Sequence, residues 1–375
     1  MGEKVRVGLI FGGRSGEHEV SLMSAQGVMG AIDREKYEVV PIGITKGGRW
    51  LAAGDPMKAL SSGVTAESNP ALLLAEPSPQ GLMRLETREQ ERALKAVQVS
   101  QLDVVFPILH GPYGEDGTVQ GLLELAGLPY VGAGVTASAV GMDKALFKDI
   151  MRAHGLPIVP YLIVKRKSWE REPEETVARI EAELGYDCFV KPANLGSSVG
   201  ISKAHNRSEL CAALDEAARY DRKLVIEVAV DAREIEVSVL GNDEPMASVP
   251  GEIVPCNEFY DYSAKYLAGE SDLLIPAPLP DETADLVRRL ATEAYLAIDC
   301  AGMARADFLL DRETGQVYVN EVNTLPGFTP ISMYPKLWEA SGVSYTELID
   351  RLIQLALERH ADRHRSATEY QVPEE

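Results

Sequence analysis

The sequence predicts an α/β protein built around parallel β-sheet. A β-rich run, "KVRVGLIFGG" at residues 4–13, ends in two glycines, a helical pattern follows it, and "YEVVPIGIT" at 37–45 is strand-like again. A strand, a helix and a second strand in this order form a βαβ unit, whose strands lie parallel. With 375 residues, of which 45% are hydrophobic and 25% charged, the chain is long enough for two or three domains.

The charge balance limits the classes of partner. The formal net charge is −20 at pH 7, so we expect no surface for a nucleic-acid backbone, although a local basic cleft for one small anion is compatible with it. No apolar run approaches the roughly 20 residues that cross a bilayer, and the first residues lack the apolar core of a signal peptide. We therefore expect a cytoplasmic protein without membrane contact. The cysteines lie far apart and form no C-x-x-C pair, which predicts core residues and no thiolate metal site.

The first region continues beyond its βαβ unit. Residues 46–100 are rich in small and turn-forming residues and predict an insertion of loops and short β pieces. The sheet resumes at 102–111, and a helix and another short strand follow. The pattern over residues 136–155 predicts one helix that leads out of this region.

Two further regions follow, and the second of them is richer in strands. Strands and helices alternate up to about residue 231, and "ADFLLDRETGQVYVNEV" then predicts two strands around a polar connection. An amphipathic helix closes the fold, and the last stretch, 361–375, predicts a frayed tail. We place the domains at residues 1–140, 141–231 and 232–360.

Two carboxylates and an amide stand on the last pair of predicted strands. Glu321 and Asn323 are two residues apart and share one face of their strand, in line with Val317 and Val319. If the two strands pair across "DRETG", Asp307 comes to lie beside them. Three oxygen ligands of this kind suit a hard divalent cation such as Mg²⁺. The alternative is a solvated polar face, but the apolar flanks count against it because buried unpaired carboxylates are costly.

Two glycine-rich stretches follow strands. In "VKPANLGSSVG", Lys191 precedes a loop of small residues whose N–H groups are able to wrap an anion. The spacing is not that of a Walker A loop, and a simple turn is the alternative. The run "FGGRSGEHEVSL" does not match G-x-G-x-x-G, which argues against a dinucleotide site. Glu17 and Glu19 after it complement the dipole of the following helix and suit an ammonium better than a phosphate.

A histidine and a polar loop complete the candidates. His110 in "LHGPYGEDG" stands at the carboxyl end of a strand, where clefts form in parallel sheets, although a lone histidine is more often structural. "NEFYDYSAKYLAGES" combines aromatic, acidic and basic residues and predicts a lid over about residues 256–275. Lys265 and Tyr266 would reach phosphate and substrate when this lid closes. A surface loop anchored by aromatic packing is the alternative.

At these residues the chain resembles the D-alanine–D-alanine ligases of the ATP-grasp superfamily. The blocks "GGRSGEHEVSL", "LHGPYGEDG", "GMDK", "VKPANLGSSVG", "FYDYSAKY", "RADF" and "NEVNTLPGFTPISMYP" are similar to that family's blocks, in its order, over nearly the whole chain. The resemblance implies a three-domain α/β ATP-grasp fold with an N-terminal parallel-sheet (pre-ATP-grasp) domain that binds substrate. It implies ATP-dependent ligation of two D-alanine molecules for peptidoglycan synthesis, through an acyl phosphate and with release of ADP and phosphate. The insertion resembles that of the longer form of the enzyme.

The resemblance also assigns roles at the nucleotide. The residues implied for binding ATP are Lys144 and Lys191 at the phosphates, Glu227 and Val230 at the adenine, Glu234 at the ribose, and Phe259 and Lys265. Those implied for holding Mg²⁺ or Mn²⁺, as two ions, are Asp307, Glu321 and Asn323. One departure is visible at Ala229, where many relatives carry a tryptophan that packs on the adenine.

A second set of roles concerns the two D-alanine molecules. Arg305 and the N–H of Gly327 are implied as the groups that stabilise the oxyanion. The residues implied for holding the substrates are Glu17 and His110 for the first molecule, and Ser332 and Lys265 for the carboxylate of the second. Ser197 and Tyr266 would link to Glu17, fix the lid and help to position or deprotonate the second amine.

Two other functions remain open. One is another ATP-grasp carboxylate ligase, such as a D-alanine–D-lactate ligase, although "AKY" with Tyr266 resembles the dipeptide-forming type. The other is a non-catalytic nucleotide-binding protein, which the filled catalytic and metal positions argue against. The family resemblance further implies a homodimer.

Overall fold

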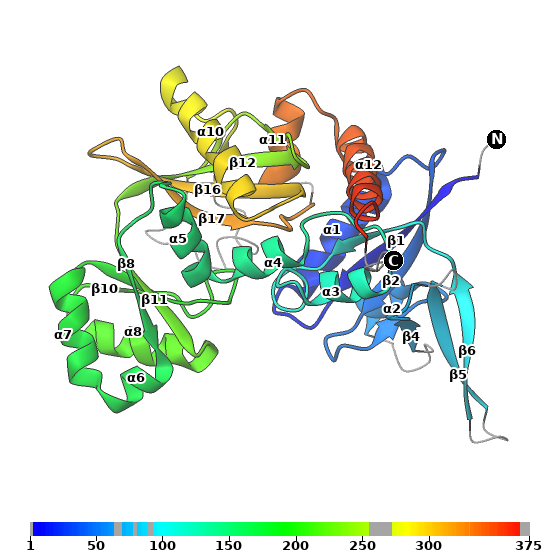
Figure 1. The fold of residues 1–375 in the computed structure, drawn as a ribbon, viewed down its shortest axis with the longest axis horizontal. Helices are drawn as coiled ribbons and strands as arrows, with labels where there is room; N and C mark the ends of the chain where they lie inside the picture. Colours follow the sequence, from blue (N-terminus) through cyan, green and yellow to red (C-terminus); the bar gives the residue numbers. More distant parts are fainter. Residues whose placement is uncertain are drawn as a thin grey trace, which may run out of the picture.

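The structure is a computed structural model and describes residues 3–63, 70–77, 81–88, 93–254, 272–329 and 331–367. The described strands form four sheets. Figure 1 shows a first α/β region, a lobe around β8–β11 and a third region that contains β12, β16 and β17. None of the described helices combines the length and the apolar character that crossing a bilayer requires.

The first sheet contains the predicted βαβ unit. Its strand order is β3–β2–β1–β7, and β1 (Val5–Gly12) pairs in parallel with both β2 (Tyr37–Ile44) and β7 (Val104–Ile108). The short β3 (Trp50–Leu51) is an antiparallel edge, and α1 (His18–Ala31) connects β1 to β2. All residues of β7 are buried, as is typical of a parallel strand covered on both faces.

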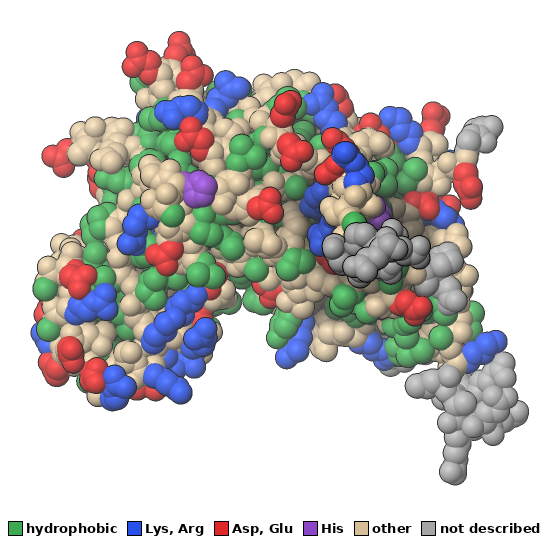
Figure 2. All heavy atoms as spheres, viewed as in Figure 1, with side chains coloured by type: hydrophobic (Ala, Val, Ile, Leu, Met, Phe, Trp, Pro, Cys, Tyr) green, Lys and Arg blue, Asp and Glu red, His purple; other side chains and the backbone are tan. Residues whose placement is uncertain are grey.

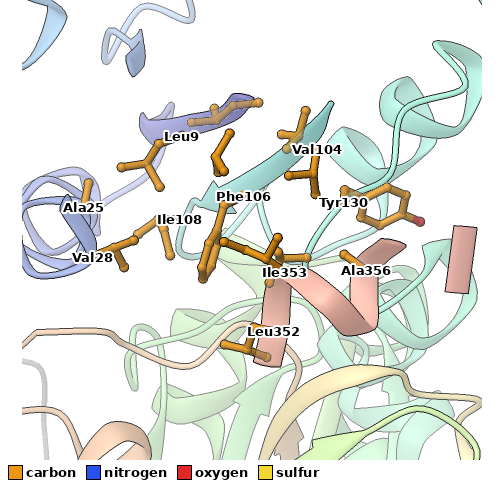
Figure 3. Close-up of a cluster of buried hydrophobic side chains, with 14 of the residues drawn as sticks. Leu9, Ala25, Val28, Val104, Phe106, Ile108, Tyr130, Leu352, Ile353 and Ala356 are labelled. Atoms are coloured by element: carbon orange, nitrogen blue, oxygen red, sulfur yellow. The ribbon is translucent and has the colours of Figure 1, made fainter. Parts of the chain in front are cut away.

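The C-terminal helix α12 (Tyr345–Arg363) packs against this first sheet. Leu352 and Ile353 belong to the same buried cluster as Phe106 of β7 (Figure 3). The predicted boundaries assign this helix to the third region, but an apolar stripe does not specify which sheet it covers. Because α12 also contacts α11 (Met333–Ala340), it joins the first region to the third.

The insertion at residues 46–100 forms a small sheet with the order β4–β5–β6. Its strands pair antiparallel and are β4 (Ala71–Leu73), β5 (Leu82–Arg88) and β6 (Ala93–Ser100). The prediction of short β pieces is confirmed. A helix that was not predicted, α2 (Pro56–Ser62), precedes them, and the Asp55 carboxylate caps it by accepting from the N–H of Lys58.

The prediction of one helix over residues 136–155 is wrong. The structure has two helices, α4 (Val135–Met142) and α5 (Lys144–Ala153), which meet at Asp143. The Asp143 carboxylate accepts hydrogen bonds from two backbone N–H groups in the first turn of α5, so it ends one helix and caps the next. A short α3 (Thr118–Leu125) precedes this pair.

The second sheet has the order β10–β9–β11–β8 and is antiparallel. Its elements are β8 (Tyr161–Lys165), α6 (Arg166–Arg171), α7 (Pro173–Glu183), β9 (Cys188–Pro192), β10 (Ser202–Ala204), α8 (Arg207–Tyr220) and β11 (Lys223–Val228). One face buries Val190, Leu224 and Ile226 against the helices. Because side chains alternate along a strand, the opposite face carries Lys191 and Glu227.

The third sheet has the order β15–β14–β12–β16–β17, with β13 beside β12. Its elements are β12 (Ala232–Gly241), β13 (Met246–Ala247), β14 (Gly251–Val254), β15 (Asp272–Leu274), α10 (Asp281–Ala297), β16 (Gly302–Asp311) and β17 (Val317–Asn323). One face packs on α10, where Val237, Ala306 and Phe308 share a buried cluster with Leu290. The opposite face is therefore left for the charged residues of β12, β16 and β17.

Candidate active site

One large cavity collects the predicted site residues. Its volume is about 1610 Å³, and the outline of the molecule is hollowed beside the lobe of the second sheet (Figure 2). The predicted site residues within the described ranges all line it: Glu17, His110, Lys144, Lys191, Ser197, Glu227, Val230, Glu234, Arg305, Asp307, Glu321, Asn323, Gly327 and Ser332. The predicted lid residues Phe259, Lys265 and Tyr266 lie outside the described residues.

Glu17 enters the cavity from the turn between β1 and α1. The turn begins at Gly12, whose φ is 90°, and a side chain there would come within 2.2 Å of the Ile44 carbonyl oxygen, so only glycine fits. Glu17 is the N-cap residue of α1, but its carboxylate makes no capping hydrogen bond. Instead it accepts a hydrogen bond of 2.5 Å from Ser197 Oγ. The contact that was expected between these two residues is present.

The glycine-serine loop that carries Ser197 is anchored at its start. The backbone N–H and the side-chain amide of Asn194 donate to Asp221 Oδ2 at 2.8 and 3.0 Å. Ser197 has a φ of 52°, a left-handed conformation that residues other than glycine adopt rarely. The loop is thus fixed to the second sheet at one end and to Glu17 of the first region at the other.

His110 follows β7 and is buried. Its Nε2 lies 3.1 Å from Ser24 Oγ on α1, and its Nδ1 lies 3.2 Å from the Leu325 carbonyl oxygen and 3.5 Å from Glu115 Oε1. Burial alone lowers the pKa of His110, but the Glu115 carboxylate overrides this effect and raises it. Because both ring nitrogens have partners, His110 ties α1 to the segment that carries Gly327.

Lys191 and Glu227 face the cavity from neighbouring strands of the second sheet. Lys191 Nζ donates to Glu227 Oε2 at 2.8 Å, and Glu227 Oε1 lies 3.3 Å from Nζ of Lys148 on α5. Burial would raise the pKa of Glu227, but the two ammonium groups lower it to about 2. Glu227 is therefore ionised at neutral pH.

Lys144 connects two sides of the cavity. It stands in the first turn of α5, where its Nζ donates to the Leu195 carbonyl oxygen at 2.9 Å. The same Nζ lies 3.7 Å from Glu321 Oε2 on the third sheet. This places one cation beside both the glycine-serine loop and a predicted metal ligand.

The three predicted metal ligands come together on β16 and β17. Asp307 lies directly opposite Glu321 in the antiparallel ladder, and Asn323 lies opposite Arg305. All four side chains line the cavity. The predicted pairing of the two strands is confirmed, and it brings the three oxygen donors to one face.

The predicted alignment of Val317 and Val319 with Glu321 is wrong. A β-bulge at Asn320 adds one residue between Val319 and Glu321, which reverses the alternation of side chains beyond it. Val317 and Val319 are therefore buried in the core together with Val322, whereas Glu321 turns to the cavity. The alternation in the sequence assumes a regular strand and cannot reveal such a bulge.

Arg305 is surrounded by acids. Its Nε and Nη2 donate to the two carboxylate oxygens of Asp307 at 2.7 and 2.6 Å, and its Nε lies 3.1 Å from Glu236 Oε2. Burial disfavours the charged guanidinium, but the carboxylates of Asp307 and Glu236 raise the pKa of Arg305. The forked geometry makes Arg305 a fixed cation in the cavity wall.

The oxygen donors fit a hard divalent cation. Asp307 and Glu321 offer carboxylates and Asn323 an amide, the ligand types that Mg²⁺ and Mn²⁺ prefer. Asn323 Oδ1 already accepts from the N–H of Leu325 at 3.0 Å, so a cation would use a remaining lone pair. The described parts of the chain hold no metal-binding group of three His, Cys, Asp or Glu side chains. A divalent-cation site on this face would therefore combine the two carboxylates with the amide of Asn323.

The segment after β17 carries Gly327 and Ser332 into the cavity. The N–H of Phe328 donates to Ser24 Oγ at 3.2 Å, and its carbonyl accepts from Tyr345 Oη at 2.5 Å. A Cβ at Gly327 would lie 2.8 Å from Ser332 Oγ, so the close approach depends on glycine. The segment is thus fixed between α1 and α12.

The chain crosses from the second to the third sheet along the cavity wall. Val230 and Glu234 line the cavity here. The N–H of Ala229 donates to the Asp187 carbonyl oxygen at 2.9 Å, which extends the ladder past the end of β11. Ala229, which departs from the family pattern, also lines the cavity.

Three further charged residues of the site were not predicted from the sequence. Lys148 follows Lys144 by four residues, which places both on one side of α5. Glu236 follows Glu234 by two residues and shares its strand face. Glu115 lies inside a block that was singled out for His110 alone. Each has a signal in its spacing, but only its partners in the fold reveal its place in the site.

The chain matches known proteins over almost its whole length. A family model described as "D-ala D-ala ligase N-terminus" matches residues 6–133, and one described as "D-ala D-ala ligase C-terminus" matches residues 150–354. The D-alanine–D-alanine ligase of Heliobacterium modesticaldum is 54% identical over 366 residues, which cover 98% of each chain. That of Thermoanaerobacter sp. (strain X514) is 55% identical over 365 residues, covering 97% of this chain and 99% of the relative.

Solved structures show the same similarity. The D-alanine–D-alanine ligase from Coxiella burnetii matches with a TM-score of 0.82 and 35% identity, covering 97% of both chains. The VanG D-Ala:D-Ser ligase from Enterococcus faecalis matches with a TM-score of 0.82 and 34% identity, covering 94% of this chain and 100% of that one.

Proposed function

The chain belongs to the D-alanine–D-alanine ligase family, and we propose that its cavity joins two D-alanine molecules through an acyl phosphate formed from ATP. It is a ligase of peptidoglycan synthesis with the ATP-grasp fold, and its family uses ATP. One observation carries the residue-level proposal: a single cavity brings together Glu17, Ser197, Arg305 and Asp307 from three regions of the chain.

ATP lies between the second and third sheets. Lys144 and Lys191 bind its phosphates, which is supported by two ammonium groups beside a glycine-serine loop. Glu227 accepts a hydrogen bond from the adenine amino group, which its ionised state supports. The backbone of Val230 contacts the adenine, and Glu234 contacts the ribose; both line the cavity.

Asp307, Glu321 and Asn323 hold Mg²⁺ or Mn²⁺, as two ions. When bound, the ions offset the negative charge of the phosphates. The support is the convergence of three oxygen donors on one face of β16 and β17. Arg305 holds both oxygens of Asp307 and so fixes the orientation of this carboxylate.

The chain's own residues orient the reacting groups. The carboxylate of the first D-alanine attacks the γ-phosphorus of ATP, and ADP leaves with the electrons of the broken P–O bond. The amine of the second D-alanine, after it has lost a proton, attacks the carbonyl of the acyl phosphate, and inorganic phosphate leaves. Glu17 binds the first ammonium group, and Ser197 holds Glu17 in place. Arg305 and the N–H of Gly327 stabilise the oxyanion, and Ser332 binds the second carboxylate. His110 anchors the wall around the first substrate.

Some roles concern residues outside the described ranges. Tyr266 with Ser197 positions or deprotonates the second amine, Lys265 binds phosphate and the second carboxylate, and Phe259 contacts the nucleotide. Their support is the family resemblance of "FYDYSAKY". The same holds for a homodimer, which light scattering of the purified chain would test. Because the reaction consumes ATP, we place the protein in the cytoplasm.

Phosphate release from the purified chain with ATP and Mg²⁺ tests the proposal. We expect release with D-alanine and none above background with L-alanine, because Glu17 and Arg305 fix the ammonium and carboxylate of one enantiomer. Release that does not distinguish the enantiomers would contradict the proposal, and so would binding of ATP without turnover.

A second candidate differs only in the second substrate. The 34% identity to a D-Ala:D-Ser ligase favours keeping this alternative. Product analysis with D-alanine plus D-serine or D-lactate, across pH, separates the candidates. We expect D-alanyl-D-alanine as the main product at neutral pH.

A further inference from the structure

Lys148 is a buried cation that the proposed chemistry does not use. It lies on α5 with 1% of its surface exposed, and its Nζ lies 5.7 Å from the ring centroid of Tyr161. The Nζ is 3.3 Å from Glu227 Oε1, outside hydrogen-bond geometry. Within the described ranges, Glu227 is the carboxylate that forms an ion pair with it.

Two lysines therefore lie beside the Glu227 carboxylate, although one ammonium group is enough to balance its single negative charge. Lys191 already donates to Glu227 at 2.8 Å. A second buried ammonium adds a large desolvation cost, and burial lowers the pKa of Lys148. Because apolar residues often replace buried ion pairs without loss of stability, folding alone does not account for Lys148.

The need for a second counter-ion arises when the nucleotide is bound. The Lys191 side chain is partly exposed and reaches the cavity, so it is free to turn to a phosphate, whereas Lys148 is enclosed. Without Lys148, Glu227 would then be a buried carboxylate with no cation beside it and would take up a proton. A protonated carboxyl donates as well as accepts, so it would no longer distinguish an amino group from a carbonyl group on the base.

We propose that Lys148 is a positioning residue for base selection, which keeps Glu227 an ionised acceptor while Lys191 is drawn to the phosphates. The site then favours nucleoside triphosphates with an exocyclic amino group over those with a carbonyl at the same position. This inference rests on the proposed function for the location of the nucleotide and deepens it.

The test compares ATP with inosine triphosphate, which carries a carbonyl in place of the amino group of ATP. The Lys148→Met variant keeps an unbranched side chain that is one atom shorter and removes its charge. We expect the preference for ATP, as the ratio of kcat/KM values, to fall about tenfold, mainly through a higher KM for ATP. The matched control is Lys36→Met, an exposed lysine paired with Asp350 in the first region, and it should leave the ratio unchanged.

A folded Lys148→Met variant with an unchanged ratio would overturn the proposal and leave Lys148 a structural residue. If that variant fails to fold, the base preference of the Glu227→Gln variant is compared with that of the Lys148→Met/Glu227→Gln variant. Both variants lack the carboxylate charge that Lys148 balances. Since Lys148 acts through Glu227, adding Lys148→Met to Glu227→Gln should not change the base preference. A further drop would also overturn the proposal.

The affinity of each nucleotide, measured by calorimetry without D-alanine, distinguishes the proposed role of Lys148 from the proposed ligase reaction. Selective ATP binding that depends on Lys148, with no phosphate release, would contradict the ligase reaction but support this inference. Ligation with a base preference that ignores Lys148 would contradict this inference alone.

Discussion

The two sheets that face each other across the cavity carry opposite charge. On the second sheet and α5, Lys148 and Lys191 surround a single acid, Glu227. On the cavity face of the third sheet, the carboxylates of Glu236 and Asp307 flank Arg305. A polyanion is attracted to the first face, whereas the second face needs a cation before it can approach one. The difference supports the proposal that lysines on one face and metal ions on the other hold the nucleotide together.

Arg305 on the acidic face gives the largest expected effect. Arg305→Ala removes the cation that we propose stabilises the developing oxyanion, so phosphate release should slow by about 10²–10³. ATP binding should persist, because Lys144 and Lys191 lie elsewhere in the cavity wall. Strongly slowed phosphate release with intact calorimetric ATP binding is the expected result.

Two controls sharpen this experiment. Arg305→Lys keeps the charge but not the fork that holds both Asp307 oxygens, so it should recover only part of the rate. Arg289→Ala on α10 removes an exposed arginine and should leave the rate unchanged. Loss of ATP binding in Arg305→Ala would show that the two faces do not act separately.

A proposed metal ligand on the same face gives the next effect. Glu321→Gln removes a carboxylate opposite Asp307, and the Mg²⁺ concentration for half-maximal rate should rise on the order of a hundredfold. A titration of phosphate release with MgCl₂ at saturating ATP measures the shift. Glu313→Gln, in the exposed turn between the same strands, is the control. An unshifted titration would place the cation elsewhere.

The contact between the first region and the glycine-serine loop gives a smaller effect. Ser197→Ala removes a hydrogen bond to the Glu17 carboxylate, and the KM for D-alanine should rise about tenfold. The KM for ATP should change less, because Lys191 and Lys144 are untouched. Initial rates over both substrates separate the constants, with the exposed Ser62→Ala as control. Equal changes in both would mean that Ser197 supports the loop rather than the substrate.

The comparison of the two faces also shows what the sequence can predict. The convergence of Asp307, Glu321 and Asn323 on one face could be predicted because strand spacing and polarity are local properties. The β-bulge at Asn320 could not be predicted, because one inserted residue hardly changes the composition of the strand. Family blocks located the lysines of the opposite face but not Lys148.

The larger elements show the same division. The parallel first sheet could be predicted from its βαβ pattern, since its periodicity lies within a short stretch. The boundary between α4 and α5 at Asp143 could not be predicted, because in the sequence a capping aspartate looks the same as a polar residue on the surface of a helix. The position of α12 against the first sheet was missed because it depends on contacts between distant parts of the chain.

The acid of the cationic face gives the smallest effect, in stability rather than rate. The pKa of Glu227 is about 2 in the folded chain against an ordinary 4.5, so its carboxylate stabilises the fold above pH 4.5. This contribution is lost as pH falls from 4.5 towards 2, because the unfolded chain then binds the proton more readily. Between about pH 5 and pH 3.5, urea unfolding should show a loss of about 1 kcal/mol that Glu227→Gln lacks. Other carboxylates titrate in both proteins, so the difference between the two curves is the relevant quantity. Parallel curves would mean that Lys148 and Lys191 do not hold Glu227 in its ionised form.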